Sequence, residues 1–173
     1  MRGAKLKTVI FDIDGVIADI SNRLKNSLKE LGVSEVSSIP RFKRKKFWEI
    51  FLSSKYMHLD EPITENIQYI RTLKKQGYRI ILLTGRREDT QKQPTLKQLE
   101  TWNVPYDEIY FRKPGDKRKD VVYKASIVRR LLKRGYEIGE IWDDMEKIAH
   151  KLKEIVPNAK IVIYNSNKGK KIL

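Results

Sequence analysis

Three apolar segments of this 173-residue sequence are each followed by residues that can bind a phosphate or a cation. The segments and the residues that follow them are 8–11 with Asp12 and Asp14, 79–83 with Thr84, Gly85 and Arg86, and 138–142 with Asp143 and Asp144. If the segments are parallel strands, their carboxyl ends meet at the sheet edge where open α/β proteins bind ligands. Carboxylates gathered at that edge would repel one another. Mg²⁺ binds one or two carboxylates together with phosphate and water, so we expect a Mg²⁺ site formed by Asp12, Asp14, Asp143 and Asp144.

The spacing of Asp12 and Asp14 suits the transfer of a phosphoryl group. Side chains two positions apart on a continuing strand point the same way, so one carboxylate can attack phosphorus while the other handles the proton of the leaving group. Asp and Glu form acyl phosphates in other enzymes, and a positioned acid typically contributes about 10²–10⁴-fold to a rate. The hydroxyl of Thr84 and the backbone N–H of Gly85 can bind phosphate oxygens. A cation is needed beside them, and Lys124 is the candidate.

Alternating strand-like and helix-like segments predict the α/β fold that would position these residues. The strands are expected at 8–11, 79–83, 108–111, 138–142 and 160–164, and the helices at 22–31, about 40–56, 62–76, from 94 onward, 120–134 and 146–155. We expect a Rossmann-like parallel sheet of about five strands with helices on both faces. The polar tail after residue 164 is expected to be loose.

The segment between the first two strands is long for a crossover connection. We expect it to fold as a small helical insert at about residues 20–60, placed over one end of the sheet. A length of 173 residues fits one domain. Residues 1–173 are therefore predicted to form a single domain that carries a cap-like insert.

The composition limits the partners and the compartment of the chain. Lys and Arg number 37 against 22 Asp and Glu, a net charge of +15, which predicts attraction to polyanions such as nucleic acid. The absence of cysteine excludes disulfides, thiolate metal sites and a Cys nucleophile. No apolar run is long enough to span a membrane, and no long apolar stretch follows the basic residues 1–5, so no signal peptide is predicted. We expect a soluble, cytoplasmic protein.

Two basic runs lie near the predicted site residues. Residues 41–46, on the expected insert, contain five basic residues in six, and residues 112–119 contain five basic residues and one acidic residue. Such runs also occur on soluble and thermophilic surfaces. Glu does not keep pace with Lys in this chain, which favours a polyanion-binding surface.

The large aromatic residues are predicted to lie in the core. This applies to Trp102 and Trp142, since buried aromatic rings contribute strongly to packing. Trp48 and Phe51 are expected to be core residues too. Because they lie on the expected insert, stacking against a nucleic-acid base is the alternative for these two.

Four motifs, in order along the chain, resemble those of the haloacid dehalogenase superfamily. They are residues 11–16 (Phe-Asp-Ile-Asp-Gly-Val), residues 82–86 (Leu-Leu-Thr-Gly-Arg), Lys124, and Asp143 with Asp144. Residues 118–124 also resemble the stretch around the corresponding lysine in the 3′-phosphatase domain of polynucleotide kinase-phosphatases. Arg23, nine residues after Asp14, and residues 60–63 are similar to that group as well. The resemblance covers roughly residues 8–165.

The resemblance implies a role for each of these residues. Asp12 would be the nucleophile, and Asp14 would be the general acid and then the general base. Mg²⁺ would be held by Asp12, the backbone carbonyl of Asp14 and Asp143, with Asp144 supporting the metal. Thr84 and Lys124 would hold the transferring phosphoryl group. The substrate-side or supporting residues would be Arg23, Gly85, Arg86 and Asp120.

Other interpretations stay open at several positions. Lys113 and Lys119 compete with Lys124 for its role. Arg23 can be a helix-surface arginine, and Asp120 can simply balance the charge of a helix N-terminus.

For the whole chain we expect a Mg²⁺-dependent phosphatase that acts through a phosphoaspartate. Its substrate would be a terminal 3′-phosphate of nucleic acid, and its role would be in end repair. A small-molecule phosphatase such as a nucleotidase is one alternative. A basic nucleic-acid-binding module without turnover is another. The sequence does not predict an oligomeric state.

Overall fold

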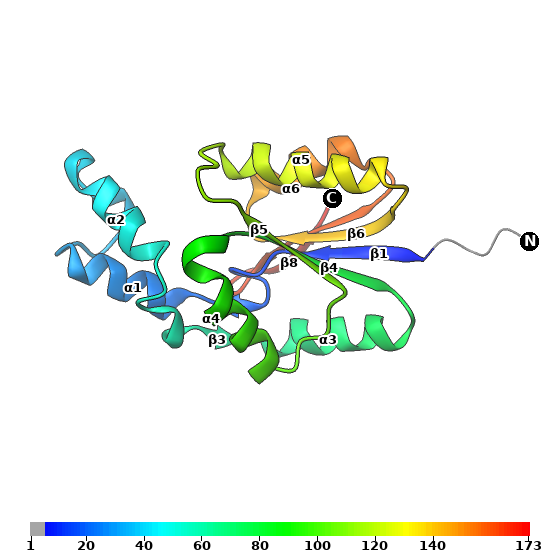
Figure 1. The fold of residues 1–173 in the computed structure, drawn as a ribbon, viewed down its shortest axis with the longest axis horizontal. Coiled ribbons are helices and arrows are strands. Elements are labelled where there is room, and N and C mark those ends of the chain that lie inside the picture. The colour runs from blue at the N-terminus through cyan, green and yellow to red at the C-terminus, as the bar shows by residue number, and fades with distance from the viewer. Residues whose placement is uncertain (1–5) are drawn as a thin grey trace, which may run out of the picture.

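The part of the chain that the structure describes, residues 6–173, is built around a six-stranded sheet (Figure 1). The structure is a computed structural model. The strands of the sheet are β1 (Lys7–Phe11), β4 (Arg79–Arg87), β5 (Glu108–Arg112), β6 (Glu137–Asp143), β7 (Lys160–Asn165) and β8 (Gly169–Ile172). Their order is β5-β4-β1-β6-β7-β8, and all neighbours are parallel except β8, which runs antiparallel to β7. The predicted α/β fold with a mostly parallel sheet is confirmed.

Helices cover both faces of this sheet (Figure 1). The helices are α3 (Thr64–Lys75) and α4 (Glu88–Thr101) on one face, and α5 (Asp120–Lys133) and α6 (Glu146–Ile155) on the other. Successive strand side chains point to opposite faces. Val9 and Phe11 of β1 accordingly pack with residues of α3 and α4, whereas Ile10 packs with residues of α5 and α6. The short apolar strands thus belong to two cores at once, which fixes the position of their carboxyl ends.

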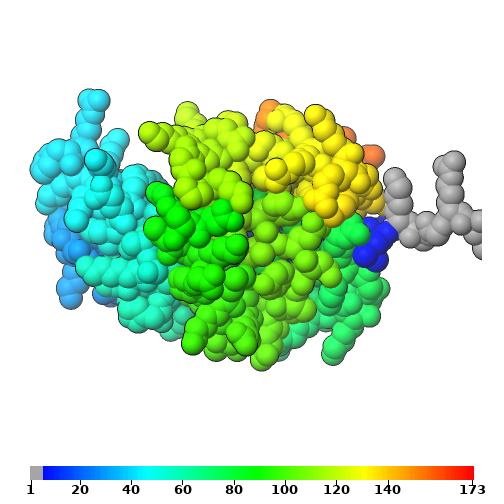
Figure 2. All heavy atoms as spheres, in the orientation of Figure 1, coloured from blue at the N-terminus to red at the C-terminus, as the bar shows by residue number. Residues whose placement is uncertain are grey.

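Residues 20–60, which we call the insert, lie beyond the carboxyl ends of these strands (Figures 1 and 2). At its base, β2 (Ala18–Asp19) pairs antiparallel with β3 (Glu61–Pro62). The elements of the insert are α1 (Ser21–Glu30), the 3₁₀ helices η1 (Val36–Ser38) and η2 (Arg41–Lys43), α2 (Arg44–Phe51) and the 3₁₀ helix η3 (Met57–Leu59). An apolar cluster of their own holds them together, formed by Leu28, Leu31, Ile39, Phe47 and Ile50. That residues 1–173 form a single domain with a cap stays a prediction.

Three predicted segments differ from the structure. The tail is not loose, because β8 pairs with β7 and adds a sixth strand. Its sequence, Gly-Lys-Lys-Ile, lacks the apolar run of the other strands. Lysine is common in edge strands, so this composition is compatible with a strand at the edge of the sheet. The helix expected at about 40–56 is split into η2 and α2. α4 begins at Glu88 rather than after Pro94, so Pro94 lies inside it instead of at the first turn where proline is favoured.

Among the described residues, no helix has the length and apolar character needed to cross a membrane. Residues 1–5, on which part of the signal-peptide prediction depends, lie outside the described part of the chain.

Candidate active site

Three carboxylates meet at the carboxyl ends of β1 and β6. Asp12 follows β1 and Asp143 ends β6, and the two strands are parallel neighbours in the sheet. One oxygen from each of Asp12, Asp143 and Asp144 lies within 4.8 Å of the others. Lys124, buried on α5, places Nζ 3.0 Å from Asp12 Oδ1 and 2.7 Å from Asp143 Oδ2. We call these four residues the acidic cluster.

The acidic cluster carries an excess of negative charge. When all its groups are ionised, three carboxylates against one ammonium leave two negative charges. Burial raises the pKa of Asp12 well above its usual value, against the opposing effect of Lys124, and the neighbouring carboxylates add to the rise. Burial and the charge of Asp143 raise the pKa of Asp144 to about 6. Burial works to lower the pKa of Lys124, but Asp12 and Asp143 outweigh it and raise that pKa.

This set of donor groups fits a hard divalent cation. Carboxylate oxygens are the ligands that Mg²⁺ prefers, and a cation would neutralise the excess charge of the cluster. Gly15 gives the carboxylate of Asp144 its space: the residue has a φ of +79°, and a Cβ there would come within 2.5 Å of Asp144 Oδ2. Asp12, Asp143 and Asp144 would hold the cation. A metal bond from the backbone carbonyl of Asp14 stays a prediction.

A pocket of about 200 Å³ opens over the acidic cluster. Thr84 and Gly85 of β4 line it, and the buried Oγ1 of Thr84 accepts a hydrogen bond of 3.1 Å from the backbone N–H of Arg86. A Cβ on Gly85 would come within 3.0 Å of Asp120 Oδ1. Asp120 is the first residue of α5 and forms an ion pair with Arg112. Asp120 therefore lies at the pocket wall and also carries negative charge at a helix N-terminus, where it is favourable.

The insert forms the opposite wall of the pocket through Trp48, Phe51 and Leu52. Phe51 is partly buried and stacks on Phe47, with ring centroids 5.5 Å apart. Trp48 is 51% exposed, so the prediction that it lies in the core is wrong. The apolar residues of α2 on the opposite side already fill the small core of the insert, which leaves the Trp48 ring outside it. Trp142 is buried, as predicted.

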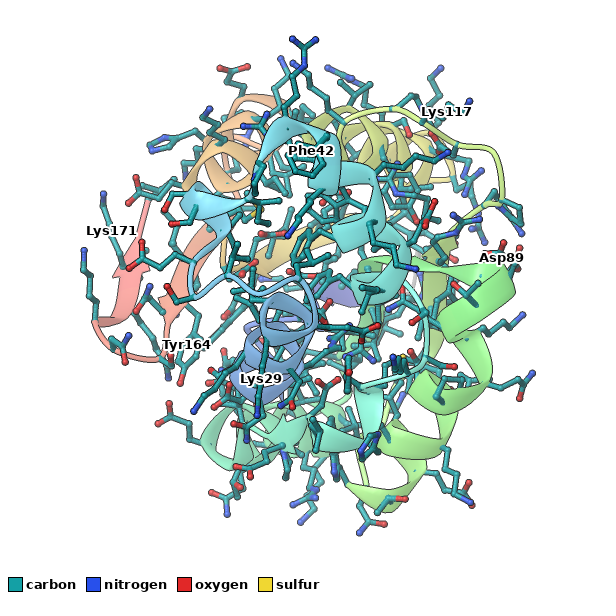
Figure 3. The ribbon with its side chains drawn as sticks, turned by 90° about the vertical axis from the view of Figure 1, so that its left-hand side faces the viewer. Lys29, Phe42, Asp89, Lys117, Tyr164 and Lys171 are labelled. Carbon is teal, nitrogen blue, oxygen red and sulfur yellow. The ribbon has the colours of Figure 1, made fainter. Side chains whose placement is uncertain are left out.

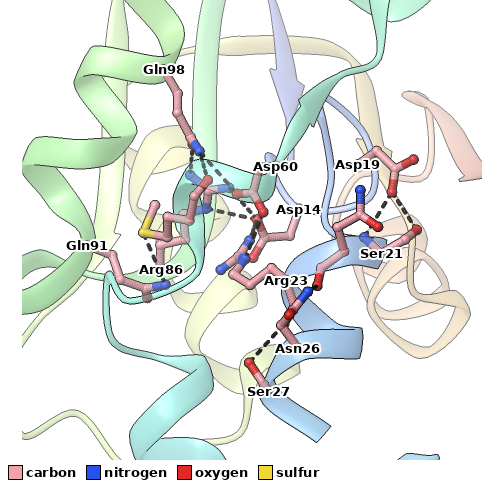
Figure 4. Close-up of polar contacts among 12 residues, drawn as sticks. Asp14, Asp19, Ser21, Arg23, Asn26, Ser27, Asp60, Arg86, Gln91 and Gln98 are labelled. Carbon is pink, nitrogen blue, oxygen red and sulfur yellow. Dashed lines mark hydrogen bonds and ion pairs between the residues drawn. The ribbon is translucent and has the colours of Figure 1, made fainter. Parts of the chain in front are cut away.

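A second group of charges surrounds Asp14 (Figure 4). Arg23 of α1 donates from Nη2 to Asp14 Oδ1 (2.7 Å) and from Nε to Asp60 Oδ1 (3.0 Å). Arg86 of β4 donates from Nε to Asp14 Oδ1 (2.8 Å) and from Nη2 to Asp60 Oδ2 (3.0 Å). Gln98 of α4 completes the network by bonding to both Arg86 and Asp60. We call Asp14, Arg23, Asp60 and Arg86 the arginine cluster.

Charges balance within the arginine cluster. The side chains of Arg23 and Arg86 are each only 1% exposed, and each contacts both carboxylates. Burial works to raise the pKa of Asp14, but Arg86 and Arg23 outweigh it and lower that pKa. Burial raises the pKa of Asp60 in spite of the same two arginines. The arginines thus hold the carboxylate of Asp14 in one place and favour its ionised form.

The arginine cluster decides between the alternatives for Arg23 and adds a residue that we had not placed in the site. Arg23 is buried, so its interpretation as a helix-surface arginine is wrong. Direct contact of Arg23 or Arg86 with a substrate stays a prediction, because in this structure both bind carboxylates of the chain. Asp60 was missed. Its one signal was the resemblance of residues 60–63, since its contacts lie 37 and 26 residues away along the chain.

A family model described as the polynucleotide kinase PNKP phosphatase domain matches residues 43–161, which is more than half of the chain. The chain belongs to this family. It is therefore a phosphatase, that is, a phosphoric monoester hydrolase. The match begins after the first motif, so the assignment of Asp12 and Asp14 depends on the geometry above. No curated protein sequence matches this phosphatase.

Solved structures share the fold of this phosphatase. A chain of the Pnkp1/Rnl/Hen1 complex superposes with a TM-score of 0.70 at 20% identity, covering 94% of this chain and 47% of that one. The haloacid dehalogenase-like hydrolase SP0104 from Streptococcus pneumoniae gives 0.68 at 16% identity, with 92% and 85% covered. The class C acid phosphatase from Bacillus anthracis with tungstate bound gives 0.62 at 16%, with 95% and 68% covered. This phosphatase spans less than half the length of the matched chain of the Pnkp1/Rnl/Hen1 complex.

The structure of the phosphatase brings most of the predicted site residues to one pocket. Those that line it are Asp12, Asp14, Thr84, Gly85, Arg86, Asp120, Lys124 and Asp144. Asp143 is buried beside Lys124, and Arg23 lies behind Asp14. Lys113, one alternative to Lys124, instead pairs with Glu88 at the surface. The three aspartates can hold the divalent metal that phosphatases of this superfamily generally use.

Proposed function

We propose that this phosphatase hydrolyses a terminal 3′-phosphate of nucleic acid, with Mg²⁺ at the acidic cluster and a phosphoaspartate formed on Asp12. The observation that carries the proposal is the position of Asp12. Its carboxylate lies at the pocket, 3.0 Å from Lys124 Nζ, and the other two cluster carboxylates lie within 4.8 Å. A carboxylate that can act as a nucleophile thus lies beside groups that can bind the oxygens of a phosphoryl group, which supports the proposal.

In the first step, a carboxylate oxygen of Asp12 forms a bond to phosphorus while the bond from phosphorus to the 3′ oxygen breaks. Asp14 gives a proton to that oxygen, and the strand leaves with a 3′-hydroxyl group. This step needs the protonated form of Asp14, which the arginine cluster disfavours. The ammonium of Lys124, the hydroxyl of Thr84 and the N–H of Gly85 bind the phosphoryl oxygens as charge develops on them. Asp12, Asp143 and Asp144 would hold Mg²⁺, which when bound would further neutralise the phosphate charge.

In the second step, water attacks the phosphorus of the aspartyl phosphate. Asp14, now a carboxylate, accepts the proton of the water, and the bond between phosphorus and Asp12 breaks. Inorganic phosphate is released and the carboxylate of Asp12 is regenerated. The arginine cluster supports this step because it holds Asp14 in place and favours its ionised form.

Nucleic acid is the proposed substrate because of charge and family. The net charge of +15 attracts polyanions, and part of the excess lies on the insert that forms one pocket wall. The family is named for polynucleotide kinase. One chain of similar fold comes from the Pnkp1/Rnl/Hen1 RNA repair complex, and by analogy we propose a role in nucleic-acid end repair. The absence of cysteine agrees with the cytoplasmic location that we propose.

The experiment is a substrate panel assayed with Mg²⁺, without Mg²⁺ and with a chelator. It contains one oligonucleotide phosphorylated at its 3′ end, the same oligonucleotide phosphorylated at its 5′ end, 3′- and 5′-mononucleotides, and an aryl phosphate. We expect Mg²⁺-dependent release with the highest kcat/KM on the 3′-phosphorylated oligonucleotide. A preference for mononucleotides that does not change with salt would instead establish a nucleotidase. Binding of the oligonucleotide without release of phosphate from any substrate would contradict the assignment of the protein as an enzyme.

A further inference from the structure

A second hollow, of about 780 Å³, adjoins the active-site pocket, and Trp48 and Leu52 line both. We call it the side groove. The insert forms one of its walls, and the others come from Arg87 at the end of β4, from the start of α4 and from Lys117 in the loop before α5. Figure 2 shows an indentation between the insert, in cyan, and the yellow-green segment that contains this loop. The side groove therefore lies beside the active-site pocket, with Trp48 and Leu52 at the boundary between them.

The Trp48 ring is suited to stacking in this groove. The ring is 51% exposed although it is large and apolar. It packs edge-on against Phe47 and Phe51, with centroids 5.1 Å and 6.1 Å away, so its orientation is fixed by its neighbours. A fixed, exposed aromatic ring beside a phosphate site is the kind of platform on which single-stranded nucleic acids stack their bases.

The charges of the side groove are mostly positive. Lys45, Arg87 and Lys117 line it, with Glu49 as the opposing carboxylate. Lys45 lies 4.0 Å from Glu49, and Arg87 pairs with Asp89, but both pairs are at least one-third exposed. Exposed pairs of this kind contribute little energy, so these cations can exchange their partners for the phosphates of a strand.

A different hollow, of about 420 Å³, leaves the site on the other side of the insert, towards β8. Figure 3 shows Lys171 on that side, opposite Lys117 and Asp89. It contains Lys168, Lys170 and Lys171, but Asp144 and Glu146 also line it and would repel backbone phosphates. Of the described residues that line this hollow, none is aromatic. Its composition suits a strand less well than that of the side groove.

We propose that the side groove binds the part of a single-stranded nucleic acid that precedes its 3′-phosphate. A base next to the reacting end stacks on Trp48, and Lys45, Arg87 and Lys117 bind backbone phosphates. This proposal rests on the proposed function, and it identifies what distinguishes a strand from a mononucleotide at this site. Trp48 acts on affinity for the strand, whereas the chemical step belongs to the acidic cluster.

The first test compares kcat/KM for a 3′-phosphorylated oligonucleotide and for an aryl phosphate in Trp48→Ala, Trp48→Phe and Phe42→Ala. Loss of one stacked base lowers affinity by roughly 10- to 100-fold, so we expect Trp48→Ala to lose at least about tenfold more on the oligonucleotide than on the aryl phosphate. Trp48→Phe should recover most of that loss. Phe42 is an aromatic residue on the same insert, 81% exposed, and its replacement should leave both substrates unaffected.

The second test measures how kcat/KM on the oligonucleotide depends on salt. Replacing Lys45, Arg87 and Lys117 together by Ala should make this dependence shallower, because each lost phosphate contact removes about one released counterion. The matched control replaces Lys168, Lys170 and Lys171 and should leave the slope nearly unchanged. A shallower salt dependence in the control alone would overturn the proposal. It would indicate that the nucleic acid instead follows the hollow towards β8.

Other outcomes separate the groove from the proposed function. Equal losses of Trp48→Ala on both substrates would show that Trp48 only supports the pocket, and would overturn its stacking role. An oligonucleotide that the wild-type protein cleaves well and that Trp48→Ala cleaves equally well would refute the side groove alone. A wild-type protein that cleaves mononucleotides but not oligonucleotides would refute both the groove and the proposed substrate.

Discussion

The acidic cluster and the arginine cluster meet at Asp12 and Asp14 but differ in their balance of charge. The acidic cluster sets three carboxylates against one ammonium, whereas the arginine cluster sets two carboxylates against two guanidinium groups. The pKa values of the two neighbouring aspartates differ in the same sense: that of Asp12 is raised and that of Asp14 is lowered, although burial raises the pKa of Asp60 in the arginine cluster as well. The acidic cluster can therefore accept a cation from outside, whereas both carboxylates of the arginine cluster are already paired with guanidinium groups of the protein.

The two clusters also join different parts of the fold. Asp12, Asp143 and Asp144 come from the ends of neighbouring strands of the sheet, with Lys124 reaching them from α5. The arginine cluster instead connects the sheet, through Arg86, to Arg23 and Asp60 of the insert. This difference supports our proposal that the acidic cluster performs the chemistry on a phosphoryl group. The arginine cluster positions Asp14 and fastens the insert over the pocket.

The largest effect that follows is loss of turnover on removing the nucleophile. We expect Asp12→Asn to lower kcat by about 10⁴-fold or more, as removal of a nucleophile commonly does. Glu154→Gln, which changes an exposed carboxylate of α6 in the same way, should keep wild-type kcat. Phosphate release measured under saturating substrate checks both variants. Substantial turnover by Asp12→Asn would remove Asp12 from the mechanism.

The next effect, on stability, separates the two clusters most sharply. Asp60→Asn leaves two buried guanidinium groups short of a partner, and breaking such a buried pair typically costs about 3–5 kcal/mol. Asp144→Asn, by contrast, relieves repulsion in the acidic cluster and should cost far less when no divalent metal is present. Urea unfolding with a chelator gives both free energies of unfolding. Similar losses in the two variants would contradict the difference in charge balance.

A third effect is stabilisation by Mg²⁺. A ligand that binds only the folded state at a hundred times its dissociation constant stabilises it by about 2.7 kcal/mol, and we expect Mg²⁺ to do so here. Asp144→Asn should lose most of this gain, because the site loses one of its three carboxylates. Glu146→Gln, a change of a nearby exposed carboxylate, should retain it. Unfolding measured across a Mg²⁺ titration checks the effect, and an equal gain in both variants would place the metal elsewhere.

The smallest effect concerns Gly15. Gly15→Ala should lower stability by roughly 1–2 kcal/mol, since an L-residue is strained at a φ of +79°. It should also weaken Mg²⁺ binding, because the new Cβ would displace the carboxylate of Asp144. Gly135→Ala has a similar φ of +84° with nothing within 4 Å of its Cβ, so it should share the strain and keep the Mg²⁺ affinity. Calorimetric titration separates the two variants. Equal Mg²⁺ affinities would show that Gly15 does not shape the metal site.

The sequence was informative where apolar strands run directly into polar residues. Asp12, Thr84 and Asp143 could be placed at one edge because the run before each is short, apolar and bounded by polar residues, and parallel strands align their carboxyl ends. The same logic could not place Lys124, since a lysine on a helix has no distinctive pattern among so many lysines. The preference for Lys124 over Lys113 and Lys119 depended on the resemblance to known motifs.

Contacts between distant segments were beyond sequence reasoning. Asp60 contacts Arg23 and Arg86 only when the insert is folded onto the sheet, so no local sequence pattern predicts the arginine cluster. Trp48 was assigned to the core because of its residue type, but the small insert had already filled its core with other side chains. β8 was missed because it has no apolar run that would predict a strand. It is a strand because it pairs with β7.

The most direct test of the account is to trap the phosphorylated enzyme. The protein is mixed with an aryl phosphate and Mg²⁺, quenched in acid during turnover, digested and analysed by mass spectrometry. The account predicts one phosphoryl group on Asp12, present with Mg²⁺, absent with a chelator and absent in Asp12→Asn. Phosphorylation of a different residue, or undiminished turnover by Asp12→Asn, would contradict the claim that the acidic cluster performs the chemistry.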